Sequence, residues 1–414
     1  MIPEGWKTYR LGEIAEIQNG FAFKSVDFSN KGIPIIKIKN IIPPNISLNE
    51  SDYYEGEITN KLKPYLITRD DVLISMTGSH LNQISSAVGK VGKYRYDFPA
   101  LLNQRVGKLF SQDRTKLDEE ILYYFISRPE TQIELVSSAG GSANQANISP
   151  DQIKQLEITI PIDINEQSRI ASILTSLDDK IELNLRMNKT LEAIAQAIFK
   201  EWFVDFRFPG FDGELVDGLP KGWRKGTIKE IYKTTSGGTP SRSNDAFFID
   251  GSIKWVKSKE LNGSFIIDTE EQITEDALNN SSAKTLPKNS LLIAMYGATV
   301  GEFGILSTEA SCNQAICAII PNERYPFTYI LGYYRLFRNR FINQASGSAQ
   351  QNISQALIQN NEVIIPKTEI AIRYHEIVSE LYAKTENNLY QNLYLQKIRD
   401  LLLPKLMTGK IKVW

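Results

Sequence analysis

Short loops rich in amide and hydroxyl side chains are the part of this sequence best suited to chemistry, and one of them occurs twice. The stretch "GSANQANIS" at 141–149 returns as "GSAQQNIS" at 347–354. Its small residues allow close backbone approach, and its amides can donate hydrogen bonds to a phosphate or a base edge. The alternative is a turn that caps the preceding helix, with "NIS" opening the last strand, and residue type favours neither interpretation.

Catalytic signatures are missing from the sequence. It contains no G-x-x-x-x-G-K-[ST] phosphate loop, no Gly-rich dinucleotide fingerprint after a strand, and no N-P-P-[FY] or D-P-P-Y tetrapeptide. The two histidines, His80 and His375, occupy non-equivalent places, and we expect His375 to be a solvated helix residue. Cys312 and Cys317 lie five apart in an expected strand and should face opposite sides, which disfavours a disulfide and a metal site. These features are typical of a binding protein rather than an enzyme.

Charge and composition limit the class of protein further. The net charge is −1, whereas a free-standing DNA-binding protein is usually basic. Any binding of nucleic acid therefore needs locally clustered cations or a partner that supplies them. We find no signal peptide and no apolar run long enough to span a bilayer, and the scarcity of cysteine favours a reducing cytosol.

The polar loop recurs because most of the chain is duplicated. Four further pairs appear in the same order: "IPEGW" and "LPKGW", "DVLISMTGS" and "SLLIAMYGA", "LLNQ" and "SCNQ", and the Ile-Pro dipeptides at 160–161 and 365–366. Their separation is far longer than a solenoid repeat. The sequence therefore predicts two copies of a domain-sized module, at 1–160 and 219–365.

Each module is predicted to be an α+β globule. Runs such as "IPIIKIKNI", "DVLISM", "SIKWVK" and "SLLIAMYG" predict strands. A helical stretch follows in each copy, "LDEEILYYFISRPETQIELVSS" and "FTYILGYYRLFRNRFINQAS". A last strand, within "IKQLEITIPI" or "LIQNNEVIIPK", is expected to close the module.

A long helix is predicted after each module, at 161–207 and 366–414, with a linker at 208–218. Seam positions spaced three and four apart predict an antiparallel coiled coil, and Pro404 should end or kink the second helix. The expected seam consists of Ile173, Leu177, Ile181, Asn184, Asn188 and Leu191 in the first helix and Ile377, Leu381, Asn388, Asn392 and Leu395 in the second.

The seam asparagines indicate how the helices pair. If the helices are antiparallel and in register, all four meet and fix that register; the alternative is that a partly wet seam tolerates them. The pairing would place the modules at opposite ends of a rod about 60 Å long, related by a pseudo-twofold axis.

This layout resembles the specificity (S) subunit of type I restriction–modification systems, over essentially the whole chain. The most specific pieces are "LPKGW", "IPIDINEQSRIASILTSLDDKIELNLRMNKTLEAIAQAIFKEWF" and "LQKIRDLLLPKLMTGKIKV". The resemblance implies two target-recognition domains, each reading one half of a bipartite asymmetric sequence in double-stranded DNA. It implies that the helices set the spacer and dock two methyltransferase (M) subunits, which bind S-adenosylmethionine. Motor/nuclease (R) subunits would use ATP and Mg, and the S chain itself would bind no cofactor or metal and catalyse nothing.

Residue type then selects candidate DNA contacts from the polar loops and basic strands. In the first module they are Lys24, Ser25, Lys37, Lys39, Thr77, Ser79, His80, Asn82, Gln83, Lys90, Ser142, Asn144 and Gln145. In the second module they are Thr239, Ser241, Arg242, Lys257, Lys259, Tyr296, Thr299, Ser348, Gln350 and Gln351.

Two alternatives stay open at this stage. The chain could be a scaffold that joins two partners through the coiled coil, which would make the polar loops incidental. Trp202, Phe203 and Phe206 at the end of the first helix could face an M subunit or pack onto their own module. A fused methyltransferase is disfavoured, because no unassigned stretch could hold a cofactor-binding fold.

Overall fold

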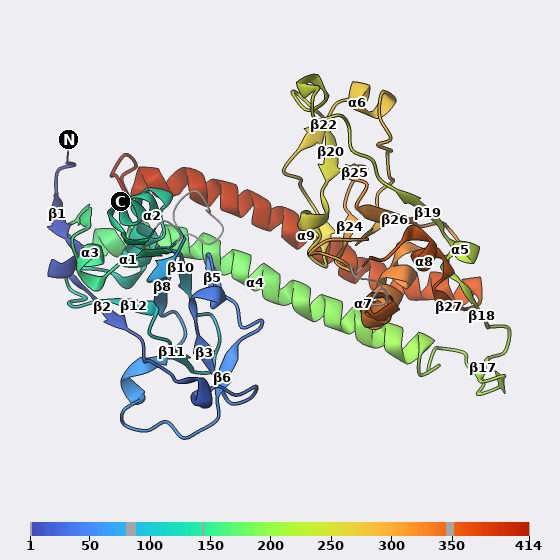
Figure 1. Cartoon of the computed structure of the whole chain (residues 1–414), viewed down its shortest axis with the longest axis horizontal. Helices are drawn as coiled ribbons and strands as arrows, with labels where there is room; N and C mark the ends of the chain where they lie inside the picture. The colour runs from blue at the N-terminus through green and yellow to red at the C-terminus, as the bar shows by residue number, and fades with distance from the viewer. Residues whose placement is uncertain (1, 80–87, 143–144, 345–351, 414) are drawn as a thin grey trace. The chain divides into compact units, whose positions relative to one another are not determined.

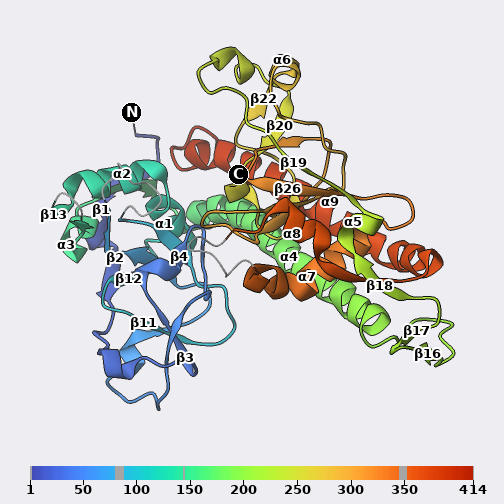
Figure 2. The same ribbon diagram turned by 45° about the vertical axis from the view of Figure 1, so that its right-hand side comes forward.

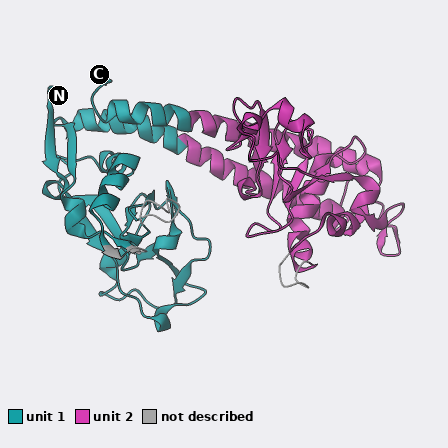
Figure 3. Cartoon of the chain, turned by 45° about the horizontal axis from the view of Figure 1, so that its top comes forward, with its two compact units in different colours: residues 1–179, 396–414 teal, residues 180–395 magenta. Residues whose placement is uncertain are grey.

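The computed structural model describes residues 2–79, 88–142, 145–344 and 352–413, and the chain divides into two compact units. Unit 1 consists of Met1–Asp179 and Gln396–Trp414, and unit 2 of Lys180–Leu395 (Figure 3). Two long helices, α4 (Ile164–Phe203) and α9 (Thr368–Leu406), contribute to both units. The units therefore divide the chain within these helices, and the five-segment division drawn from the sequence stays a prediction.

The described residues of unit 1 form four sheets, and Figure 1 shows most of their strands. The largest has the order β2 (Ala15–Asn19), β12 (Val106–Ser111), β8 (Val72–Ser75), β10 (Val91–Lys93), β5 (Asn45–Ile46) and β4 (Ile41–Ile42). A second has the order β6 (Asp52–Tyr54), β3 (Ile33–Ile36), β11 (Ala100–Leu102) and β7 (Leu66–Ile67). The others are the pair β1 (Trp6–Arg10) with β15 (Glu157–Pro161), and β13 (Gly140–Ser142), β14 (Gln145–Asn147) and β9 (Thr77–Gly78).

The helical stretch of unit 1 is broken in two, where the sequence predicted one run. Helix α1 (Glu119–Ile126) begins at Asp118, whose side chain accepts from the N–H of Glu120 at 2.9 Å. Helix α2 (Pro129–Ser138) starts anew because Pro129 forces Arg128 into an extended conformation. A short helix, α3 (Pro150–Lys154), precedes the last strand.

Unit 2 has the same kinds of element. Its main sheet has the order β19 (Lys233–Ser236), β26 (Ile316–Ile320), β23 (Leu291–Ala294), β24 (Phe303–Leu306) and β21 (Phe265–Ile266). A second has the order β22 (Gln272–Ile273), β20 (Ile253–Val256) and β25 (Ser311–Cys312), and β18 (Arg224–Thr227) pairs with β27 (Glu362–Ile365). Its helices are α5 (Ile228–Ile231), α6 (Glu275–Asn279), α7 (Phe327–Gln344) and α8 (Gln355–Asn360). Beyond the end of α4, β16 (Leu215–Val216) and β17 (Leu219–Pro220) form a small hairpin (Figure 2).

The predicted duplication is confirmed by the topology inside each unit. The order β2-β12-β8-β10 corresponds to β19-β26-β23-β24, and β6-β3-β11 corresponds to β22-β20-β25. The pairs β3–β11 and β20–β25 are both parallel, and β1–β15 and β18–β27 are both antiparallel. Both modules are α+β, as the sequence predicts.

Within unit 2, α4 and α9 pack antiparallel through the four asparagines. Asn184 Nδ2 donates to Asn392 Oδ1 at 2.8 Å, and Asn388 Nδ2 donates to Asn188 Oδ1 at 2.8 Å. All four side chains are buried, so the wet-seam alternative is wrong and the residues act as a register device.

One predicted seam position is wrong. Ile377 is 45% exposed, and the buried face of α9 passes instead through Tyr374, Val378 and Tyr382. The two tyrosines pack against aromatic side chains of unit 2, so the packing of the module rotates the buried face by one residue there.

The aromatic end of α4 packs onto its own module. Trp202 and Phe203 are buried in the core of unit 2, where the Phe203 ring lies 4.9 Å from Tyr329 and 5.8 Å from Trp223. The expectation that His375 is solvated is wrong, because it is half-buried and its Nδ1 lies 3.2 Å from Thr328 Oγ1.

Candidate nucleic-acid interface

The lysines expected on strands lie instead on turns that follow the strands. Strand β3 ends at Ile36, and Lys37 begins a 3-10 turn over Ile38–Asn40. The Asn40 side chain accepts from the Lys37 N–H at 2.9 Å, which ends the strand's hydrogen-bonding ladder. Lys39 therefore lies within the turn, and the alternation of a strand does not apply to it.

Both lysines of this turn contact one carboxylate. Asp52, on β6, lies 2.8 Å from Lys37 Nζ and 3.4 Å from Lys39 Nζ. Lys37 Nζ also lies 3.5 Å from the centre of the Phe28 ring, a cation–π distance. The hydrogen bond from Lys37 lowers the pKa of Asp52, so the carboxylate stays ionised.

The second module repeats this arrangement. Lys257 follows β20 and begins a 3-10 turn over Ser258–Glu260, and Glu260 accepts from its N–H at 2.6 Å. Lys257 Nζ lies 2.7 Å from Glu270 and 2.8 Å from Glu271, and Lys259 Nζ lies 2.6 Å from Glu270. Hydrogen bonds from the two lysines lower the pKa of Glu270 to about 2. The two lysines of the turn therefore contact two carboxylates that lie outside it, just before β22.

Arg242 joins the same cluster in unit 2. Its guanidinium lies 2.6 Å from Glu271 and 4.4 Å from the centre of the Phe248 ring, with Trp255 at 4.9 Å. The side chain of Arg242 is 52% exposed, so its guanidinium stays accessible to a ligand despite these contacts. Beside it, the hydroxyls of Ser241 and Ser243 are 2.8 Å apart.

Other candidates divide by their exposure. Lys24 and Ser25 are exposed in the first module, and Tyr296 is 39% exposed in the second, beside the half-buried Thr299. Thr77 is buried and donates to Asn147 Oδ1 at 2.8 Å, which places its hydroxyl inside the module. The remaining described candidates are the half-buried Ser79, Lys90 and Thr239, and the backbones of Ser142 and Gln145 in β13 and β14.

Some candidates lie outside the described residues: His80, Asn82, Gln83, Asn144, Ser348, Gln350 and Gln351. Their contact with DNA stays a prediction. The backbone around them is informative, because Thr77 pairs with Asn147 and Gly78 with Ala146 between β9 and β14. This pairing joins the described strands next to two candidate stretches that are far apart in the sequence.

The repeated letters "NIS" have a structural explanation in both units. The hydroxyl of Ser149 accepts from the Gln152 N–H at 3.2 Å and caps α3, and Ser354 accepts from the Leu357 N–H at 3.1 Å and caps α8. The expectation that these letters open the last strand is therefore wrong, because a short helix comes between. Each serine thus caps the helix that follows it and not the preceding helix expected from the sequence, and the DNA contact of the loop stays a prediction.

Lys90 lines a cavity of about 510 Å³ in unit 1. Tyr123, Tyr124 and Arg128 form one side of this cavity, and Arg399 of α9 another. Burial lowers the pKa of Lys90 and that of Arg128. Carboxylates of Glu130, Asp178 and Asp400 also line the cavity, so it lacks the net positive charge that a phosphate backbone favours.

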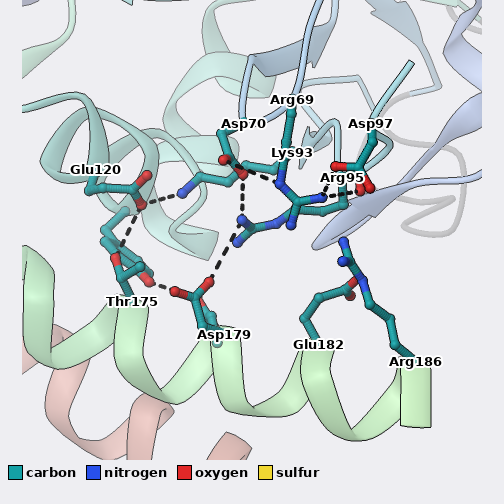
Figure 4. A network of polar contacts seen from close by, with 12 residues as sticks. Arg69, Asp70, Lys93, Arg95, Asp97, Glu120, Thr175, Asp179, Glu182 and Arg186 are labelled. Atoms are coloured by element: carbon teal, nitrogen blue, oxygen red, sulfur yellow. Dashed lines mark hydrogen bonds and ion pairs between the residues drawn. The ribbon is translucent and has the colours of Figure 1, made fainter. Parts of the chain in front are cut away.

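A polar network in unit 1 fixes the module to α4, and sequence reasoning missed it (Figure 4). Lys93 on β10 is almost fully buried and pairs with Glu120, which accepts from Thr175 Oγ1 of α4 at 3.2 Å. Arg95 lies 3.8 Å from Asp179. The surrounding "VGKYRYD" reads as an ordinary basic strand, so no sequence signal distinguishes these cations from surface ones.

The described residues contain neither a cluster of metal ligands nor a membrane-spanning helix. In residues 2–79, 88–142, 145–344 and 352–413, no group of three His, Cys, Asp or Glu side chains is placed to hold a metal ion. Among the helices of those same segments, none combines the length and apolarity that crossing a membrane requires. Cys312 and Cys317 are free and buried, on β25 and β26.

Comparison with known proteins gives consistent matches. The family model described as type I restriction modification DNA specificity domain matches residues 3–193 and 220–394. The chain is 28% identical over 425 residues to the type I restriction enzyme MjaIX specificity subunit of Methanocaldococcus jannaschii, covering 100% of this chain and 95% of that protein. It is 29% identical over 359 residues to the HindI specificity subunit of Haemophilus influenzae, covering 71% and 78%. Its fold is similar to that of an S subunit from M. genitalium, with a TM-score of 0.61 at 17% identity over 97% of this chain and 96% of that one.

Proposed function

Because this chain belongs to the type I restriction–modification DNA specificity family, we propose that each of its modules reads one half of a bipartite, asymmetric DNA target. The observation that carries the proposal is the repeated turn. In each unit a turn with two lysines follows the corresponding strand, β3 in unit 1 and β20 in unit 2. Lysines hold phosphates and thereby fix register, while neighbouring amides and hydroxyls read base edges. Two modules with different loops would read two different half-sites.

We also propose that α4 and α9 set the distance between the half-sites and dock two M subunits. Apolar side chains remain exposed on these helices within unit 2: Leu183 and Leu185 on α4, at 52% and 42%, and Ile377 on α9, at 45%. A bound M subunit would remove such apolar side chains from water, which favours docking. In such a complex the M subunits would bind S-adenosylmethionine and methylate adenine. The R subunits would use ATP and Mg, and this chain would contribute recognition without catalysis.

The test is the methylome of cells that express this chain with its M subunit, obtained by single-molecule sequencing. A split motif of two short half-sites, with adenine methylated on both strands, is the expected result. Lys24→Ala in unit 1 and Tyr296→Ala in unit 2 should weaken or alter methylation while the M subunit still copurifies. Lys225→Ala, an exposed lysine of β18 outside the candidate loops and the long helices, is the matched control and should leave the motif unchanged. Copurification without any modified motif would favour a scaffold.

A further inference from the structure

The two lysine turns share more than their sequence pattern. Each follows a strand paired in parallel with a neighbour, β3 with β11 and β20 with β25. Each is closed by the same device, a side chain three residues on that accepts from the first lysine's N–H. The geometry that presents the two ammonium groups is therefore the same in two units whose loops differ.

The carboxylates that contact these lysines also occupy corresponding places. Asp52 lies on β6, and Glu270 and Glu271 come directly before β22; these two strands correspond in the two sheet orders. The carboxylate oxygens lie 2.6 to 2.8 Å from the nearest Nζ atoms, as phosphate oxygens would in a bound complex.

These ion pairs are accessible at their outer edge. The side chain of Lys39 is 47% exposed, that of Lys259 is 61% exposed, and that of Glu270 is 52% exposed. Exposed pairs of this kind contribute little to stability, so a competing anion can replace the carboxylate at small cost. Lys37 and Lys257 are more deeply placed, with exposed fractions of 25% and 15%.

We propose that each turn is a subsite for a DNA backbone phosphate, and that the carboxylates occupy it until a phosphodiester displaces them. Asp52 occupies the subsite of unit 1, and Glu270 and Glu271 that of unit 2. The inference rests on the proposed function, since it presumes that the modules bind DNA. The carboxylates then set how readily the chain holds DNA of any sequence, because each phosphate contact must first break an internal ion pair.

The experiment measures binding of the full-length chain to a fluorescent duplex of random sequence, by anisotropy over a series of salt concentrations. Asp52→Asn should raise the affinity about two- to five-fold, the factor expected for losing a competing exposed ion pair. Lys39→Ala should lower the affinity and reduce the salt slope by about 1, as the loss of one phosphate contact requires. Lys259→Ala and Glu270→Gln make the same comparison in unit 2.

Two controls separate this effect from a general change in charge. Glu55→Gln removes a carboxylate that is close in sequence to Asp52 but pairs with Lys31 at 2.6 Å. Glu275→Gln removes an exposed carboxylate four residues after Glu271. Both should change affinity less than the subsite variants do. In a chain already lacking Lys37 and Lys39, the gain from Asp52→Asn should disappear.

Each outcome decides one question. Lysine variants that bind with an unchanged salt slope overturn the phosphate subsite, as does a gain from Asp52→Asn that persists without the lysines. A wild-type chain that binds no duplex, alone or with its M subunit, contradicts the proposed function instead. Because some of these side chains are partly buried, with Lys37 25% and Asp52 33% exposed, melting temperatures that match the wild type will show that each variant is folded.

Discussion

The buried asparagine layer makes a prediction that depends on an asymmetry between its members. Asn392 Oδ1 accepts from Asn184, and its Nδ2 donates to the Ile181 carbonyl at 3.4 Å. Asn388 donates to Asn188, but its own Oδ1 has no hydrogen-bond partner. Asn392→Ala therefore removes two hydrogen bonds and no unsatisfied atom. Asn388→Ala removes one hydrogen bond and, with it, one unsatisfied acceptor.

The magnitude follows from these contacts. Loss of a buried partner costs about 1–3 kcal/mol, and the truncated side chain leaves a void. Exposed Asn387, one residue before Asn388, receives the same Asn→Ala change and gains at most about 0.7 kcal/mol from helix propensity. We expect the free energy of unfolding of Asn392→Ala to be about 2–3 kcal/mol lower than that of Asn387→Ala. That of Asn388→Ala should be lower than the same control by about 1 kcal/mol or less.

Urea unfolding followed by tryptophan emission is the assay. Three of the five tryptophans, Trp202, Trp223 and Trp255, lie in unit 2, so the signal reports mainly the unit that contains the asparagines. The double variant Asn184→Ala with Asn392→Ala should cost less than the sum of the single variants. If Asn388→Ala proves as costly as Asn392→Ala, the reasoning from the unpaired oxygen is refuted.

Three further outcomes are expected. Burial lowers the pKa of His375 below 6.5, so the unfolded chain binds more protons in that range; stability should fall as the pH drops below 6.5, and His375→Gln should flatten this part of the urea-midpoint curve. Glu120→Gln should destabilise unit 1 by about 3 kcal/mol or more in urea unfolding followed by circular dichroism, because it leaves the buried Lys93 charge without its partner, whereas Lys93→Met leaves a carboxylate that is 28% exposed and should be nearly neutral; equal costs would contradict this. Burial raises the pKa values of Cys312 and Cys317 to about 12, so both thiols should react with a thiol reagent at pH 8 only after urea is added, and rapid labelling of the native chain would show that they are not buried.

Sequence periodicity was sufficient to predict the long helices and the repeated modules. It did not predict where side-chain hydrogen bonds to the backbone end a strand. The long helices, the seam asparagines and the module duplication all follow from spacing that spans many residues. The β-branched residues before Lys37 and Lys257 favour strands that continue through both lysines, yet the side chains of Asn40 and Glu260 end both strands early. Such local hydrogen bonds leave no periodic signal.

The carboxylates of the candidate site could not be found from sequence for a different reason. Asp52 meets its lysines through the pairing of β3 with β6, and Glu271 meets Arg242 across 29 positions. Ile377 was misplaced because the aromatic packing of unit 2 selects Val378, and that choice depends on tertiary contacts. Which charges pair across a sheet, and which helix face turns inward, are decided only when the module has folded.

The strand pair at the base of each module also bears on how such chains diversify. Trp6 is aligned with Pro161 and Arg224 with Ile365, so the first strand of a module lies beside the strand that leads into its long helix. The segment between these two strands therefore begins and ends at neighbouring positions of one strand pair. A genetic exchange that replaces this segment and keeps the strand pair would join a new module to an unchanged helix. New target preferences can thus arise by transplantation rather than by gradual substitution.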